Sequence, residues 1–337
     1  MRCFFIVFDL IPKAKLPPIN PVAIIYVLYH ILAIAFSITL MLISYAILAT
    51  KGLNYGIDFA GGTIVQVKYD KAAPISQMRE KLQSNKLFDN SSITKFGSPD
   101  EVIIRMKTSS ASVTKDIGDI TREALKGTGN FTIRRVDIVG PKVGSELREK
   151  GIMSMLLAIA GILIYVAFRF EWRFAVASIV ALIHDVSIAS GAVALFNIDV
   201  NLDVLAALLT LLGYSLNDTI IVFDRIREGI VGSKKSNLAE IINESITRTL
   251  SRTTLTSLTT FFVVFTLFMF GGEIIHPFAF TMLIGIIVGT YSSIFVASPI
   301  LLWFGFDVKN YHAKLAEKAK REAEKNRMRE QFESGVM

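Results

Sequence analysis

Six long apolar segments constrain this 337-residue chain more than any other feature of its sequence. A helix needs about 20 mostly apolar residues to cross the hydrocarbon core of a bilayer. A soluble domain of this length would carry more charge and shorter apolar runs, whereas this chain is 52% hydrophobic with a mean hydropathy of +0.50. We therefore predict an α-helical polytopic membrane protein with six transmembrane helices, approximately at residues 22–49, 152–168, 174–196, 204–223, 255–270 and 278–304.

The first apolar segment, residues 22–49, has a second interpretation. It follows a short head with basic residues, and small residues lie near Tyr45-Ala46, as at the cleavage site of a signal peptide. The segment is about twice as long as the apolar core of a signal peptide. Its length favours a retained transmembrane helix over a cleaved leader.

Basic residues occur in alternate connections between the predicted helices. Connections 197–203 and 271–277 contain no Lys or Arg. The connections on the other side and the tail 305–337 are basic, with Arg169, Arg173, Arg225, Arg227, Lys234, Lys235 and Arg248 among their residues. Because Lys and Arg gather in cytoplasmic loops, we expect the N-terminus, residues 1–21, and the basic tail to be cytoplasmic. This distribution accounts for the formal net charge of +7 without a nucleic-acid partner.

Residues 50–151 contain no apolar segment long enough to cross a membrane, which predicts a water-exposed domain between the first and second helices. Alternating or short apolar runs predict strands at 63–69, 93–96, 102–106 and 131–139, and helical spacing predicts helices at 75–82 and 112–126. The order βαββαβ is typical of a ferredoxin-like α+β domain. With both termini cytoplasmic, this domain is expected in the periplasm, because long domains are translocated largely regardless of their charge.

Cofactor chemistry has no candidate residues in the sequence. Cys3 is the only cysteine, and the four His residues are spread along the chain, so we expect no metal site. Neither a nucleophile–base arrangement nor a phosphate-binding glycine loop is present. We therefore expect a protein that is not an enzyme and holds no cofactor.

Ionisable residues inside the predicted helices are the first candidates for function. Each such residue costs about 2.5–3.5 kcal/mol to place at the centre of a membrane helix. His184 and Asp185 lie near the middle of the third helix, and Asp218 lies in the fourth, next to Asn217. We predict a site for ion coupling around these residues.

The fifth predicted helix begins with Arg252 and a series of hydroxyl side chains that includes Thr256. Since the fourth and fifth helices run antiparallel, Asp218 and Arg252 are expected to meet inside the bundle. Burial pushes a carboxylate toward protonation, and a mobile cation pulls it toward ionisation, so the two together make a proton-binding site. The hydroxyls and Asn217 can hold the water that carries protons to it. The alternative is a static buried ion pair that only fixes helix packing.

Small residues mark both ends of the water-exposed domain, where it meets the membrane. Gly61 and Gly62 follow Asp58, and this glycine pair fits a turn better than a ligand cradle. Pro141 and Gly144 could shape the joint at the other end. We expect these five residues to carry motion between the helices and the domain.

Five motifs, in order along most of the chain, resemble the SecF subunits of the SecD/SecF protein-translocase family. They are Tyr55–Thr63 (YGIDFAGGT), Val139–Gly144 (VGPKVG), Leu182–Val186 (LIHDV), Gly213–Glu228 (GYSLNDTIIVFDRIRE) and Thr249–Ser257 (TLSRTTLTS). Ala60 is a departure, because the family often has Thr or Ser there. The resemblance implies half of a transporter of the resistance-nodulation-division superfamily, located in the bacterial inner membrane.

The same resemblance implies partners and an activity. A SecF-like chain is expected to pair with SecD and to use a proton or sodium gradient in late steps of protein export through SecYEG. Translocating preproteins, membrane lipids and YajC are the further partners implied. In the family the residues matching Asp218 and Arg252 carry ion coupling. Two alternatives stay open: a non-energised scaffold of the translocase, and half of another exporter of the superfamily.

Overall fold

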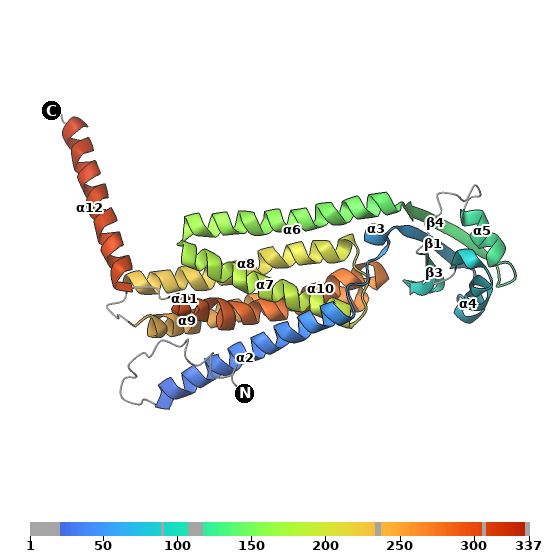
Figure 1. Ribbon diagram of the computed structural model, residues 1–337, viewed down its shortest axis with the longest axis horizontal. Helices are drawn as coiled ribbons and strands as arrows, with labels where there is room; N and C mark the ends of the chain where they lie inside the picture. The colour runs from blue at the N-terminus through green and yellow to red at the C-terminus, as the bar shows by residue number, and fades with distance from the viewer. Residues whose placement is uncertain (1–20, 89–90, 107–116, 233–236, 305–307, 334–337) are drawn as a thin grey trace.

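Six long apolar helices run along one another in the computed structural model, which describes residues 21–88, 91–106, 117–232, 237–304 and 308–333 (Figure 1). They are α2 (Pro21–Thr50), α6 (Pro141–Arg169), α7 (Trp172–Leu195), α8 (Leu202–Gly232), α9 (Leu238–Phe270) and the pair α10 (Gly272–Ser292) and α11 (Ser298–Trp303). Each of the six is long and apolar enough to cross a membrane. The helices and the small sheet described below are those of a polytopic membrane protein.

Helix bounds extend beyond the predicted spans because apolar composition marks only the part inside the bilayer. α6 begins at Pro141 rather than at residue 152, with Gly140 before it. Proline is favoured at the first position of a helix, since its missing N–H has no intrahelical partner there. α9 begins at Leu238 instead of residue 255, because no Gly or Pro interrupts the sequence from 238 to 270.

The sixth span is not one regular helix as predicted for residues 278–304. It begins at Gly272, and a π-helical turn, Ser293–Ala297, separates α10 from α11. Pro299 has no N–H to donate to the preceding turn, so the backbone widens before it. The Ser298 hydroxyl donates to the Ser293 carbonyl oxygen at 3.1 Å, across this turn.

A four-stranded antiparallel sheet lies beyond one end of the bundle. Its strands are β1 (Gly62–Tyr69), β2 (Ser92–Phe96), β3 (Ser98–Met106) and β4 (Phe131–Val139), in the spatial order β2-β3-β1-β4. β3 begins before the predicted residue 102, because Gly97 turns the chain tightly at φ +70°. Helices α4 (Ile75–Gln83) and α5 (Ile117–Ala124) accompany the sheet; residues 112–116 of the predicted second helix lie outside the described residues.

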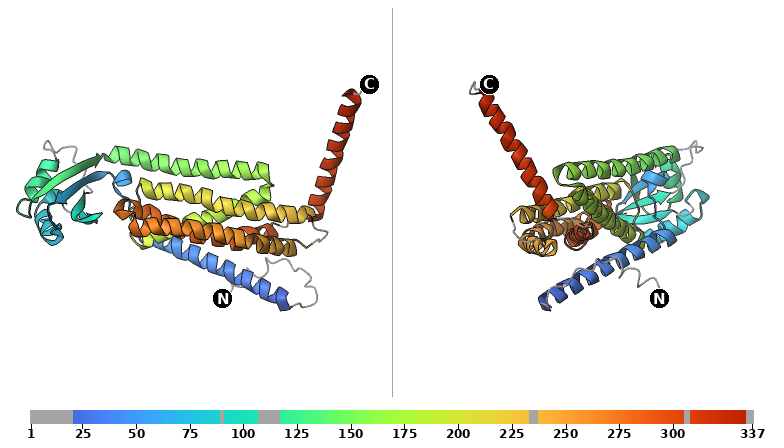
Figure 2. Two further views of the ribbon diagram at one scale, coloured as in Figure 1. Left: turned by 180° about the vertical axis from the view of Figure 1, so that it is seen from behind. Right: turned by 60° about the vertical axis from the view of Figure 1, so that its left-hand side comes forward.

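The core of the sheet domain is separate from the core of the bundle. Val65 and Val67 of β1, Ile104 of β3, and Met78 and Leu82 of α4 are almost fully buried together. Two short helices lie between the longer elements: the 3₁₀ turn Lys86–Phe88 and α3 (Ile57–Ala60), which joins α2 to β1. α12 (Val308–Glu333) projects from the opposite end of the bundle, away from the other helices (Figure 2).

Three helices form the centre of the bundle. In their most apolar windows, 56% of α7, 50% of α8 and 56% of the α10–α11 span is buried, against 11% to 17% in α2, α6 and α9. Large apolar side chains of the outer helices are exposed, among them Leu157 of α6 and Phe262 and Val263 of α9. Polar groups that must avoid lipid are therefore expected on α7, α8 and α10.

Candidate functional site

Asp185 on α7 is one of two fully buried carboxylates of the described residues, with no exposed surface. His184 Nδ1 lies 2.9 Å from Asp185 Oδ1. Ser215 Oγ of α8 and Ser292 Oγ of α10 both donate to Asp185 Oδ2, at 2.5 and 2.8 Å. One carboxylate therefore holds the three central helices together, in a medium where an unpaired charge would be very costly.

Asp218 on α8 is the second buried carboxylate, also without exposed surface. Ser257 Oγ of α9 donates to Asp218 Oδ2 at 3.0 Å, and Thr290 Oγ1 of α10 donates to Ser257 Oγ at 2.7 Å. Asp218 Oδ1 has no hydrogen-bond partner in the described part of the chain. A buried acceptor left unpaired costs about 1–3 kcal/mol, so this oxygen is a place for a proton or a bound cation.

α10 serves both carboxylates through side chains two residues apart. Thr290 faces α9 and reaches Asp218 through Ser257, whereas Ser292 faces α7 and reaches Asp185. Gly289 makes the close approach possible, because a Cβ there would lie 3.1 Å from Ser215 Cβ and 3.5 Å from Asp185 Oδ2. We call these residues the carboxylate network: His184, Asp185, Ser215, Asp218, Ser257, Thr290 and Ser292.

The structure does not bring Asp218 and Arg252 together as expected. Arg252 is exposed on α9, five residues before Ser257, and no ion pair joins it to Asp218. Five residues turn a helix by about 140°, so Ser257 faces the network while Arg252 faces outward. Thr256 is exposed beside it, donating only to the Arg252 carbonyl oxygen at 2.7 Å, and Asn217 is exposed on α8.

The five residues expected at a joint do meet at the sheet end of the bundle; we call Asp58, Gly61, Gly62, Pro141 and Gly144 the sheet–bundle joint. A Cβ on Gly61 would lie 2.9 Å from Pro141 Cα, and one on Gly144 would lie 2.9 Å from Gly61 N. Gly61 also has φ +76° and Gly62 φ +146°, backbone angles that residues with a side chain rarely adopt. The glycines therefore allow α3 to pack directly on the first turn of α6.

Family models match most of the chain. The C-terminal model of the SecD/SecF protein export membrane proteins matches residues 120–307, and the SecD/SecF GG motif matches residues 46–73. The chain belongs to the SecD/SecF family. Protein translocase subunit SecF of Helicobacter pylori strain J99 is 48% identical over 307 residues, which cover 91% of this chain and 95% of that protein. SecF of Vibrio alginolyticus is 45% identical over 288 residues, covering 85% of this chain and 91% of that relative.

Solved structures of the family have the same arrangement of chain. The crystal structure of SecDF from Thermus thermophilus, described as a translocon-associated membrane protein, has a TM-score of 0.71 and 36% identity over 80% of this chain. A SecDF crystal structure in a super-membrane-facing form has a TM-score of 0.60 and 35% identity over 85% of this chain. This chain spans 37% and 38% of those two chains, so it matches less than two fifths of SecDF.

The family's GG motif is the glycine pair of the sheet–bundle joint. Gly61 and Gly62 lie within the matched residues 46–73, as does Asp58. In the structure their function is steric, since any side chain at either glycine would meet backbone atoms, of Pro141 or of Met106. The SecD/SecF signature therefore marks the place where the sheet domain meets the helices.

Four members of the carboxylate network, Ser215, Ser257, Thr290 and Ser292, were not among the predicted site residues. Thr290 and Ser292 are the two that lie in the sixth span. Their signal was a cluster of hydroxyl side chains in the sixth apolar segment, at 290, 292, 293 and 298. Ser and Thr within a helix commonly lie against a carbonyl of the preceding turn, and both hydroxyls are within hydrogen-bond distance of one, at 2.8 and 3.1 Å. Only their second contacts, to Ser257 and Asp185, reveal the role.

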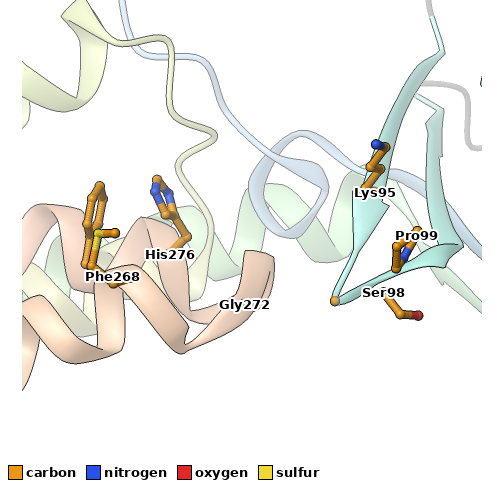
Figure 3. Close-up of a pocket in the computed structure, with 8 residues that line it drawn as sticks. Lys95, Ser98, Pro99, Phe268, Gly272 and His276 are labelled. Carbon is orange, nitrogen blue, oxygen red and sulfur yellow. The ribbon is translucent and has the colours of Figure 1, made fainter.

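A small open cleft separates the sheet from the tip of α9 and α10 (Figure 3). Its volume is about 360 Å³. Lys95, Ser98 and Pro99 of the β2–β3 hairpin line one side of it, and Phe268 and His276 line the other. The Phe268 and His276 rings contact each other, with centroids 4.4 Å apart. Among the described residues no group of three or more His, Cys, Asp or Glu side chains could hold a metal, at this cleft or elsewhere.

Proposed function

We propose that the chain is the SecF-type half of a complex with SecD, which uses a proton or sodium gradient across the bacterial inner membrane to drive late steps of protein export. The observation that carries the proposal is the unpaired Oδ1 of Asp218, buried at the centre of a bundle in a protein-translocase family. Ion binding at that oxygen changes the charge of the bundle's core. A conformational cycle needs a group of this kind, whose state biases two arrangements of the protein.

Ion binding at Asp218 has an immediate structural consequence. In this structure Ser257 links Asp218 to Thr290, so α8, α9 and α10 share one chain of hydrogen bonds. A protonated Asp218 can donate as well as accept, whereas the ionised form only accepts. The preferred partners of the carboxyl therefore differ between its two states, and the packing of α8 against α9 is proposed to differ with them.

The exposed face of α9 is the surface that we propose contacts SecD. Arg252 and Thr256 lie at this face, among exposed apolar side chains such as Leu255 and Phe262. A cation facing lipid at bilayer depth is costly, so the face is expected to be covered by another membrane protein. We propose that SecD covers it and that Arg252 acts in that interface, where a carboxyl of either subunit can meet it.

The sheet domain is the part proposed to act on exported chains. Its strand order β2-β3-β1-β4, with α4 and α5 accompanying the sheet, supports a ferredoxin-like domain inserted between the first and second transmembrane helices. Basic residues at the other end of the bundle, such as Arg169 and Arg225, support a periplasmic location for this domain and a cytoplasmic one for both termini. The SecYEG channel and the preprotein emerging from it are the partners this location implies.

Preprotein export in cells that carry Asp218→Asn tests the proposal. The amide has nearly the same shape as the carboxyl but cannot take up a proton, so we expect export to fall at least tenfold. Asp224→Asn is the matched control, because Asp224 lies on the same helix in a half-exposed ion pair with Arg169. Recovery of SecD with each variant establishes assembly. Normal export with Asp218→Asn would leave the chain as a scaffold of the translocase.

A further inference from the structure

Asp58 of the sheet–bundle joint caps a helix that lies far away in the sequence. The backbone N–H of Leu202, the first residue of α8, donates to Asp58 Oδ2 at 3.1 Å. The first N–H groups of a helix have no intrahelical partner, and a carboxylate is stabilised by the positive end of the helix dipole. α8 is thus capped by a residue 144 positions earlier.

The local capping residue of α8 does not perform this function. Asn201 lies at the capping position, since its carbonyl accepts the first hydrogen bond of the helix, from Leu205 N at 3.2 Å. Asparagine is among the preferred capping residues, yet Asn201 Oδ1 has no partner in the described part of the chain. A capping residue is thus present in the local sequence, but the first N–H of α8, that of Leu202, bonds Asp58 instead.

Further hydrogen bonds fix the segment before Asp58 to the segment before α8. Gly56 N donates to the Val200 carbonyl at 3.0 Å, and Val200 N donates to the Asn54 carbonyl at 2.8 Å. Asn54 Nδ2 also donates to Asp199 Oδ1 at 2.5 Å. Residues 54–58 and 199–202 therefore behave as one unit.

The same unit continues into the sheet. Asp58 belongs to α3, which ends immediately before Gly61 and β1 and packs on the first turn of α6. α8 carries Asp218 further along the same helix. A displacement of α8 along its axis would therefore reach β1 through α3 without crossing a flexible segment.

We propose that Asp58 is a positioning residue that couples the α8 helix to the sheet domain by capping α8 from α3. The proposal rests on the proposed function, in which Asp218 responds to an ion gradient. Asp58 itself binds no ion in this account. What it must supply is a hydrogen-bond acceptor at the N-terminus of α8.

Substitutions that separate the acceptor from the charge test this role. Asp58→Asn and Asp58→Ser keep an acceptor of the kind preferred at helix caps, whereas Asp58→Ala removes it. Leu202→Pro removes the donor instead and keeps a residue that is favoured at the first helical position. If the cap transmits movement, Asp58→Ala and Leu202→Pro have the same defect, and the double variant is no worse than either.

The readout is the distance between the sheet domain and the far end of α8, in liposomes that contain the complex with SecD. Fluorophores at Glu80→Cys and Gly232→Cys, in a Cys3→Ser background, report on exposed positions of α4 and α8. An imposed ion gradient is expected to change energy transfer in the parent chain, in Asp58→Asn and in Asp58→Ser. The change is expected to fall at least fivefold in Asp58→Ala and Leu202→Pro.

Each outcome decides between the proposals. A full response in Asp58→Ala would overturn the capping role, while the export defect of Asp218→Asn would still stand by itself. Equal loss in Asp58→Asn and Asp58→Ala would also overturn it, because the charge and not the acceptor would then be required. Recovery of SecD at the parental level by the Asp58→Ala chain excludes misfolding as the cause of a loss.

Discussion

Ser292 on α10 donates a hydrogen bond of 2.8 Å to Asp185 on α7, a residue 107 positions earlier in the chain. Two residues before Ser292, Thr290 serves the other buried carboxylate through Ser257. One helix thus bonds one buried carboxyl directly and reaches the other through Ser257. A π-helical turn follows directly at Ser293–Ala297, and such turns often occur at functional sites.

Loss of the Ser292 hydroxyl should destabilise the bundle. In Ser292→Ala the fully buried Asp185 keeps its bonds to Ser215 and His184 but loses one donor, at a cost of about 1–3 kcal/mol. Thermal unfolding of the purified chain in detergent measures this loss. Ser293→Ala is the control, because that buried hydroxyl bonds only the backbone carbonyl of Thr290. Equal unfolding temperatures for the two variants would show that Asp185 does not depend on Ser292.

A methyl group at Gly289 should disturb the same network by a steric route. The new Cβ would lie 3.1 Å from Ser215 Cβ and displace the residue that bonds Asp185, and overpacking of this kind costs about 1–3 kcal/mol. Gly213→Ala on α8 is matched, since nothing lies within 4 Å of its Cβ and Ala is the better helix former. Unfolding temperatures should fall for Gly289→Ala alone. An unchanged value there would mean that α10 can move away freely.

Gly61→Ala should weaken the sheet–bundle joint beyond the usual cost of a positive φ. That cost is about 1–2 kcal/mol, and Gly52→Ala shares it, because Gly52 has φ +69° with nothing within 4 Å of its Cβ. At Gly61 the Cβ would also lie 2.9 Å from the backbone of Pro141. Limited proteolysis between the sheet and the helices should therefore be faster in Gly61→Ala than in Gly52→Ala. Equal rates would argue against close packing at the joint.

Arg252→Gln distinguishes a role of Arg252 in the stability of the single chain from a role in the interface with SecD. Arg252 is exposed and does not pair with Asp218, so the stability of the isolated chain should stay within about 0.5 kcal/mol. Recovery of SecD by the tagged chain should fall severalfold, if this face is the SecD interface. Arg248→Gln, one helical turn away in a surface ion pair with Glu244, should lower neither quantity. A large loss of stability in Arg252→Gln would instead indicate a buried pair with Asp218.

The sequence predicted much of the fold, because apolar length and alternation are local properties. The six apolar helices and the four strands in their order along the chain follow from them. Helix ends such as Pro141 and Leu238 lie beyond the apolar segments, where hydropathy gives no signal. Element boundaries were therefore the weaker part of the prediction.

Partners within the site could not be predicted in the same way. Whether Asp218 meets Arg252 or Ser257 depends on the rotation of α9 about its axis, which packing determines and composition does not. The cap that Asp58 provides for Leu202 joins residues 144 positions apart, so no local pattern indicates it. The helix on which each residue lies was the predictable quantity, and the direction of each side chain was not.

The most direct test of the account is the effect of an ion gradient on late translocation in inverted membrane vesicles, with the parent chain or with Asp218→Asn. Preprotein is first driven partway across and the driving ATP is then removed, so that only the gradient can complete transport. The account predicts that the gradient speeds completion at least tenfold with the parent chain and has no effect with Asp218→Asn. Equal acceleration in both would contradict ion coupling at Asp218.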